Sequence, residues 1–183
     1  MILNEKELVN RCIDNDRHAQ QFLFNQHFND LYLIAMRYLS DHHDAEDAVS
    51  LSFIRIFKSL SRFSYQGQGS LGKWIRTILI NEAIRSLKKR KLIDFNVDVK
   101  QLKIVHEDAN GLQQMQAADI VNMIEKLPTG YRTVFNLFVI EGYSHKEIAG
   151  LLGISESTSK TQLKKARNHL MNSINEEKKY GAI

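Results

Sequence analysis

The sequence predicts an all-α protein that consists of two helical domains joined by a linker. Apolar residues recur with a helical period along most of the chain, which holds only one proline and nine glycines. A hydrophobic content of 43% is enough to build packed cores. Because the periodicity weakens in between, we expect helical domains at 1–92 and 117–175, a linker at 93–116 and a tail at 176–183.

Composition and charge narrow the classes of function. The net charge of +4 at pH 7 mildly favours an anionic partner. A single cysteine, Cys12, excludes an internal disulfide and a cysteine-based zinc site. His42 and His43 stand beside acids, but adjacent residues point in different directions and no third ligand is evident. We therefore expect a solvated loop there, and no metal or other cofactor.

Two further classes have no support in the sequence. The N-terminus is polar from Asn4, and no apolar run approaches the length of a membrane span, so we expect a cytoplasmic protein without membrane insertion. The chain carries no phosphate loop, nucleophile elbow or spaced metal cluster. We therefore expect a protein that is not an enzyme.

The first two predicted helices, 5–13 and 19–39, are amphipathic. Cys12 stands at helical spacing from Leu8 and is expected to be a small buried apolar residue. The second helix carries an aromatic-rich stripe that we interpret as core. Its members are Phe22, Leu23, Phe28, Leu31, Tyr32, Ile34, Ala35 and Tyr38.

A third helix is predicted over 48–61, after an acidic run at 40–47 that offsets the positive end of its dipole. Helical spacing separates an apolar face from a polar one. The face expected to be buried comprises Val49, Phe53, Ile56, Phe57 and Leu60. The residues expected outside or at the edge are Asp47, Ser50, Leu51, Arg55 and Lys58.

A loop with two aromatic residues, 63–70, precedes a strongly basic helix predicted over 71–91, with Ser70 as its cap. From Lys73 to Lys91 there are seven Lys or Arg and one acid, Glu82. Proteins bind single-stranded nucleic acid with cations that neutralise its phosphates and with aromatic rings that stack on its bases. The alternative is an ordinary solvated helix end.

The C-terminal part predicts a helix-turn-helix after a helix at 117–126 and a break at Leu127-Pro128. Ser144 and Glu147 have the spacing of a capping box that starts one short helix. Gly153 stands where a left-handed residue ends that helix, and Ser155 can cap the next. The helix after Pro128 is lined by Val134, Phe135, Phe138 and Ile140.

The second helix of this pair has two distinct faces. At 100° per residue, Ser159, Leu163, Ala166 and Leu170 share the inner face. Ser157, Thr161, Lys164 and Asn168 lie opposite, with Lys160 and Arg167 on the flank. Between 157 and 170 there are four Lys or Arg and no acid, which favours binding to duplex DNA. A solvated basic face is the alternative.

Three ordered blocks resemble the extracytoplasmic-function sigma factors of the sigma-70 family, the promoter-recognition subunits of bacterial RNA polymerase. The first is RYLSDHHDAEDAV at 37–49 with FIRIF at 53–57, and the second is WIRTILIN at 74–81 with LKKRK at 87–91. The third comprises LP at 127–128, EIA at 147–149, LGIS at 152–155 and AR at 166–167. Unlike this chain, the family usually has valine at the Ser159 position and often an acid at the Arg85 position.

The resemblance implies three contact surfaces. Core RNA polymerase would bind Asp44, Asp47, Ser50, Leu51 and Arg55. Melted promoter DNA would bind Phe63, Tyr65, Lys73, Trp74, Arg76, Asn81 and Lys88. Duplex promoter DNA would bind Ser157, Lys160, Thr161, Lys164, Lys165 and Arg167, with Lys165 and Arg167 on phosphates. An anti-sigma factor is a further expected partner.

One alternative function remains open at this point. A two-domain transcription regulator can carry a similar helix-turn-helix without using core polymerase as its platform. Such a regulator predicts a sensing or dimerising N-terminal domain. The basic helix at 71–91 instead favours a second nucleic-acid contact, and therefore a sigma factor.

Overall fold

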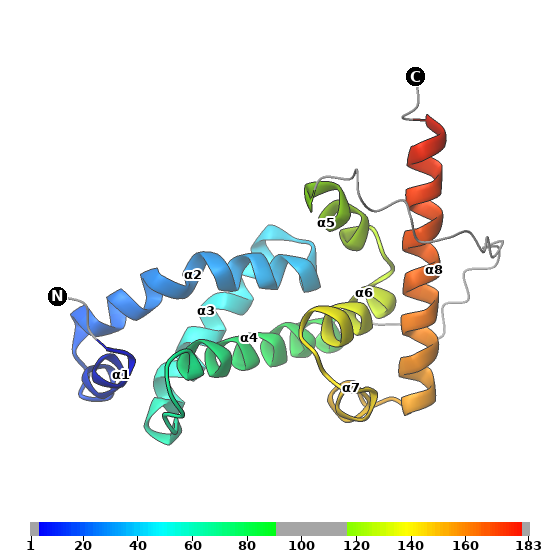
Figure 1. Ribbon diagram of the computed structural model, residues 1–183. Coiled ribbons are helices and arrows are strands. Elements are labelled where there is room, and N and C mark those ends of the chain that lie inside the picture. The colour runs from blue at the N-terminus through cyan, green and yellow to red at the C-terminus, as the bar shows by residue number, and fades with distance from the viewer. Residues whose placement is uncertain (1–3, 91–116, 181–183) are drawn as a thin grey trace. The chain divides into compact units, whose positions relative to one another are not determined.

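The computed structural model describes residues 4–90 and 117–180, with side chains described over 4–90 and 121–175, and every regular element in them is helical (Figure 1). The predicted all-α class is thereby confirmed for the described residues. The chain divides into two compact units, Met1–Arg90 and Lys91–Ile183. The predicted linker, 93–116, lies outside the described residues.

Over residues 4–90, the first unit has four helices and a short 3-10 turn. They are α1 (Glu5–Ile13), α2 (Arg17–Leu39), α3 (His42–Ser59), η1 (Leu60–Arg62) and α4 (Ser70–Lys89). Asp16 and Asp41 cap α2 and α3 by accepting hydrogen bonds from backbone N–H groups of the first turn. Helix α3 therefore begins six residues before the predicted start, and the acidic run forms its first turns.

The core of this unit is formed where α2, α3 and α4 pack together. Val49, Phe53 and Ile56 of α3 are buried, as their spacing predicts. Cys12 is also buried, and desolvation raises the pKa of its thiol to about 11. The prediction for Phe22 is wrong, because its side chain is 51% exposed. It lies about 100° round the helix from the fully buried Leu23, and so outside the inward stripe.

Over residues 117–180, the described part of the second unit, there are four helices and one π-helical turn. They are α5 (Ala117–Glu125), α6 (Thr129–Phe135), η3 (Asn136–Ile140), α7 (His145–Leu152) and α8 (Glu156–Tyr180). The break at Leu127-Pro128 is present, and Pro128 takes the N-cap position of α6. Leu127, Tyr131 and Ala166 form a buried cluster that holds α6 against α8. Helix α8 continues past residue 175, the predicted end of the domain.

Within the described residues, no helix is long and apolar enough to cross a bilayer. The same part of the chain has no group of three or more His, Cys, Asp or Glu arranged to hold a metal ion.

Candidate polymerase and nucleic-acid interfaces

The helix-turn-helix corner has the predicted caps. Glu147 accepts a hydrogen bond from the Ser144 backbone N–H at 2.8 Å, and the Ser144 hydroxyl accepts one from the Glu147 N–H at 3.3 Å. Hydrogen bonds from the Ser144 side chain and backbone hold the pKa of the Glu147 carboxyl below its usual value. Gly153 ends α7 at φ 74°, and the Ser155 hydroxyl accepts from the Thr158 N–H at 3.0 Å. The capping-box and corner predictions are therefore confirmed.

Helix α8 separates its residues as the periodicity predicts. Ser159, Leu163 and Ala166 are buried against the rest of the unit. The exposed residues of the outer face and flank are Ser157, Lys160, Thr161, Lys164 and Arg167. Lys165 is half-buried at the edge of this face. The unit thus presents a helix with exposed hydroxyl, ammonium and guanidinium groups, which is suited to a DNA groove.

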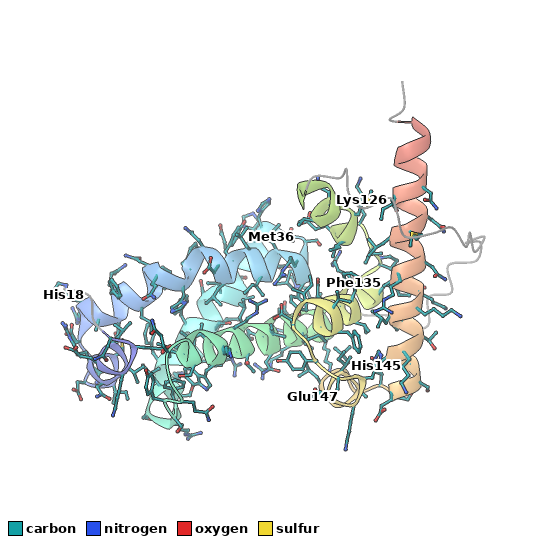
Figure 2. The ribbon with its side chains drawn as sticks, in the orientation of Figure 1. His18, Met36, Lys126, Phe135, His145 and Glu147 are labelled. Atoms are coloured by element: carbon teal, nitrogen blue, oxygen red, sulfur yellow. The ribbon has the colours of Figure 1, made fainter. Side chains whose placement is uncertain are left out.

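His145, which the sequence reasoning missed, joins the two helices of the corner. Its Nδ1 lies 2.9 Å from the hydroxyl oxygen of Ser159, and its ring stacks on Phe138 with centroids 4.4 Å apart. Figure 2 shows His145 on the side of α7 that faces α8. Burial, with the positive charge of Lys160, lowers the pKa of His145. The sequence signal for this contact was Ser159, a serine in the apolar stripe of α8, because a buried hydroxyl requires a hydrogen-bond partner.

Helix α3 presents a continuous outer stripe in the first unit. Asp47, Ser50, Leu51 and Arg55 are all exposed, and Ile54 lies between them. The side chains of Leu51 and Ile54 are 47% and 51% exposed, so the stripe combines apolar and charged groups. Such a mixture is typical of a protein-binding surface.

Asp44 differs from the other four candidate polymerase contacts. Its side chain is only 6% exposed, and its carboxylate receives a hydrogen bond of 2.5 Å from Arg90, just after the end of α4. Asp44 therefore ties α3 to the end of α4 and, unlike the residues of the exposed stripe, is buried.

Glu82 forms a second buried link between α3 and α4. Its carboxylate is 6% exposed and lies 2.5 Å from both the Arg55 and the Arg85 side chains. One candidate polymerase contact, Arg55, is thus positioned by a carboxylate on the helix expected to bind promoter DNA. The sequence alone shows Glu82 only as a lone acid in a basic helix.

The candidate single-strand contacts lie along α4 and the loop before it. Lys73 and Lys88 are exposed, whereas Trp74, Arg76 and Asn81 are partly buried. The Phe63 and Trp74 rings pack on each other with centroids 5.2 Å apart. Tyr65 is 42% exposed, which leaves it the more accessible ring of the loop.

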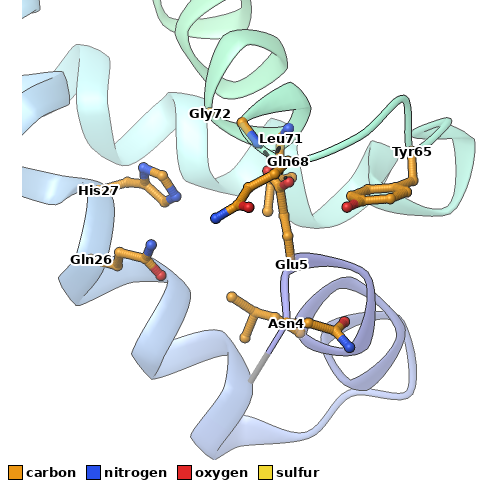
Figure 3. A pocket seen from close by; sticks show the side chains of 10 residues that line it. Asn4, Glu5, Gln26, His27, Tyr65, Gln68, Leu71 and Gly72 are labelled. Carbon is orange, nitrogen blue, oxygen red and sulfur yellow. Dashed lines mark hydrogen bonds between the residues drawn. The ribbon is translucent and has the colours of Figure 1, made fainter. Parts of the chain in front are cut away.

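The predicted cap at Ser70 is wrong. The N-cap position is Gly69, while the Ser70 hydroxyl turns back into the loop, donating to the Gly67 carbonyl at 2.6 Å. The start of α4 is instead capped by Glu5 of α1, which accepts from the backbone N–H of Gly69 at 2.9 Å and of Leu71 at 2.7 Å (Figure 3). Sequence reasoning missed Glu5.

A pocket of about 530 Å³ opens where α1, α2 and this loop meet (Figure 3). Burial lowers the pKa of His27 within it, which favours a neutral imidazole. The polar and aromatic side chains of its lining come from Asn4, Glu5, Gln26, His27, Tyr65 and Gln68. The lining thus offers hydrogen-bonding amides together with an accessible aromatic ring.

Two family models match the chain, one covering most of the first unit and the other lying within the second. The model of sigma-70 region 2 matches residues 23–93, and the model of sigma-70 region 4 matches residues 117–170. The first match includes α3, the loop and α4, and the second includes the helix-turn-helix.

Curated relatives are similar over most of the chain. The ECF RNA polymerase sigma factor SigE of Mycolicibacterium smegmatis is 28% identical over 81% of this chain, and the match spans 58% of the length of that relative. The ECF RNA polymerase sigma-E factor of Haemophilus influenzae is 26% identical, with coverage of 94% of this chain and 96% of the relative.

A solved structure shares the fold. The sigma factor RpoE of Bartonella quintana, crystallised with the anti-sigma factor NepR, has a TM-score of 0.50 and 22% sequence identity. The likeness covers 83% of this chain and 94% of RpoE.

Proposed function

Because the chain belongs to the sigma-70 family, whose models match both of its units, we propose that it is an extracytoplasmic-function sigma factor that directs RNA polymerase to specific promoters. One observation carries this proposal: regions 2 and 4 of the family occur in order, one in each unit, at 23–93 and 117–170. A regulator that shares only the helix-turn-helix would not account for the first match.

The outer stripe of α3 is the proposed contact with core RNA polymerase. Asp47, Ser50 and Leu51 are accessible there, and Arg55 is accessible although its guanidinium also pairs with Glu82. Asp44 supports this surface indirectly, because its buried carboxylate bonds Arg90. Burial of the exposed apolar groups of the stripe would stabilise the complex with polymerase. Its charged groups would fix the orientation in which the two proteins bind.

The loop at 63–70 and helix α4 are the proposed contacts with melted promoter DNA. Lys73, Arg76 and Lys88 would neutralise phosphates of the non-template strand. The pocket beside Tyr65 is large enough for one unpaired base, and Asn81 lies farther along α4. Extruding a base costs a few kcal/mol of stacking, which ring and amide contacts can offset.

Helix α8 is the proposed reader of duplex promoter DNA. Lys160, Thr161 and Lys164 would face base edges, while Lys165 and Arg167 would bind phosphates. Ser157 lies at the start of the helix, where the backbone N–H groups also favour a phosphate. Because both DNA-binding units belong to one chain, binding of one unit raises the effective concentration of the other at its own promoter element.

We propose the cytoplasm as the place of action, because core polymerase and chromosomal DNA are there. An anti-sigma factor that covers the exposed stripe of α3 or the face of α8 is the proposed regulator. This chemistry needs no covalent step: recognition and promoter opening are binding reactions.

The first test is co-elution of the full chain with core RNA polymerase on a sizing column. We expect the unmodified protein to co-elute and Asp47→Lys to reduce co-elution strongly. Glu46→Lys is the matched control, because it makes the same charge change at an exposed neighbouring position of α3. Arg55 is less suitable for this test, because its replacement would also disturb Glu82.

Two outcomes would separate the candidate functions. Loss of co-elution with Asp47→Lys alone supports a sigma factor that docks through α3. If the unmodified protein and an isolated segment, 1–92, both ignore polymerase while the full chain binds duplex DNA, the alternative regulator is correct.

A further inference from the structure

The start of α4 depends on a side chain that lies more than sixty residues away in the sequence. A helix leaves its first backbone N–H groups without intrahelical partners, and Gly69 at the N-cap has no side chain to satisfy them. The two carboxylate oxygens of Glu5 accept the Gly69 and Leu71 N–H groups separately, at 2.9 Å and 2.7 Å. The negative charge of Glu5 also faces the positive end of the α4 dipole.

The loop before α4 needs such restraint because of its backbone. Gly67 and Gly69 have φ values of 106° and 84°, in the region where only glycine is free of strain. A segment with two such glycines has many accessible conformations. Ser70 fixes the loop from within, by bonding the Gly67 carbonyl and the Gln66 N–H, and Glu5 fixes it from α1.

The same contact shapes the pocket. Asn4 and Glu5 form one part of its lining, and Tyr65 and Gln68 of the loop form another, as Figure 3 shows. The two hydrogen bonds of Glu5 join these two parts of the lining. Glu5 is therefore placed to determine the width of a pocket that it does not fill.

We propose that Glu5 is a positioning residue for promoter opening: it holds the loop at 63–70 in the conformation that receives an unpaired base. This role rests on the proposed function, since it assumes that the pocket takes a base of the melted strand. Glu5 acts through the loop backbone, because its two oxygens are already engaged and a carboxylate repels the phosphates of DNA. Binding to core polymerase is expected to be independent of Glu5, because the exposed stripe of α3 does not include it.

The cap itself is tested by amide hydrogen exchange on the full chain. We expect Glu5→Ala to accelerate exchange at Gly69 and Leu71, and Glu5→Gln, which keeps one acceptor oxygen, to have a smaller effect. Glu7→Ala is the matched control, because it removes an exposed acid from the same first turn of α1. Fluorescence of Trp74, the single tryptophan, verifies that each variant is folded. Equal exchange in the Glu5 and Glu7 variants would overturn the cap.

The role in opening is tested with a promoter selected by the holoenzyme from a random library. An abasic series along its non-template strand first identifies the base whose loss most slows opening by the unmodified protein. On the intact promoter we expect Glu5→Ala to slow opening about fivefold, the factor that corresponds to loss of a helix cap. On the promoter with that base removed we expect the two proteins to open at similar rates, because there is no base left to position.

The outcomes distinguish this inference from the function on which it rests. A fivefold defect that persists on the abasic promoter would overturn the positioning role while leaving the sigma function intact. Absence of any base-sensitive position in the unmodified protein would overturn base capture, and with it the role of Glu5, although hydrogen exchange would still report the cap. If Glu5→Ala is unfolded, Glu5→Gln takes its place in both measurements.

Discussion

The two units differ in what their positively charged side chains contact. In the first unit, Arg55 and Arg85 pair with the buried carboxylate of Glu82, and Arg90 pairs with that of Asp44. In the second unit, Lys160 and Lys164 extend from α8 into solvent, in a stretch that contains no acid. Arginines of the first unit therefore hold its helices together, whereas cations of the recognition helix are available to an external anion.

Whether a cation is already paired determines how much it can contribute to DNA binding. An arginine that already satisfies a buried carboxylate gains less from a phosphate, because binding must compete with an existing ion pair. An exposed lysine without such a partner releases counterions when it meets DNA, so its contribution depends strongly on salt. Substitutions in the ion pairs of Glu82 and Asp44 should therefore change folding of the first unit, and substitutions of the exposed α8 cations should change DNA affinity.

The largest expected effect is on folding of the first unit. Glu82→Ala leaves Arg55 and Arg85 without their shared partner, and we expect the free energy of unfolding to fall by about 2 kcal/mol. This value is below that for a fully buried pair, because the two arginine side chains are 49% and 54% exposed. Denaturant unfolding followed by Trp74 fluorescence measures it, since that tryptophan lies in the first unit.

The control for this substitution is Glu46→Ala, which removes an exposed acid of α3 and should change stability by less than about 0.5 kcal/mol. An equal, small effect of both substitutions would mean that Glu82 does not hold the arginines. The contrast between the units would then fail.

The second effect concerns DNA affinity of the second unit. We expect Arg167→Ala to weaken binding of promoter duplex by about 1 kcal/mol, nearly uniformly across sequences, while unfolding is unchanged. The slope of log affinity against log salt should fall by about 0.9, the value for one lost phosphate contact. Fluorescence anisotropy at several salt concentrations measures both quantities. Lys126→Ala, an exposed cation outside α8, is the control, and an identical loss there would indicate a non-specific charge effect.

The third effect concerns the corner of the helix-turn-helix. Gly153 has φ 74°, and a Cβ there would meet nothing within 4 Å, so Gly153→Ala adds backbone strain alone and should destabilise the unit by about 1 kcal/mol. Gly150 lies inside α7 with equally open surroundings, and Gly150→Ala should stabilise the unit by about 0.5–1 kcal/mol. Native-state hydrogen exchange at α7 amides measures both. Shifts of the same sign would show that the corner conformation is not maintained.

Local features of both units could be predicted from the sequence, and features that join distant residues could not. The capping box needs only Ser144 and Glu147, three residues apart, and the corner needs only Gly153. The Glu5 cap and the Glu82 link instead depend on how helices pack. A buried acid and an exposed one have the same letter in a sequence, and only tertiary structure separates them.

The candidate sites follow the same division. Periodicity correctly separated the exposed Lys160 and Lys164 from the buried Ser159, because both faces belong to one helix. The family resemblance placed Asp44 among the polymerase contacts, although its carboxylate is buried against Arg90. The pocket could not be predicted, since its lining combines three segments that are separate in the sequence.

The smallest expected effect is at Ser159, whose buried hydroxyl contacts His145 at 2.9 Å. We expect Ser159→Val to change the stability of the second unit by less than about 0.5 kcal/mol, because apolar packing replaces one hydrogen bond. Ser159→Ala should cost about 1 kcal/mol, because it removes the bond without filling the space.

Hydrogen exchange at α8 amides, with duplex binding as a second measurement, distinguishes these two variants. A neutral Ser159→Val beside a costly Glu82→Ala would sharpen the contrast, since the buried polar contact of the second unit is replaceable and the buried carboxylate of the first is not. A loss above about 2 kcal/mol in Ser159→Val would contradict it. The His145–Ser159 contact would then be as essential to the recognition helix as Glu82 is to α3 and α4, because an unsatisfied buried group carries its full desolvation penalty.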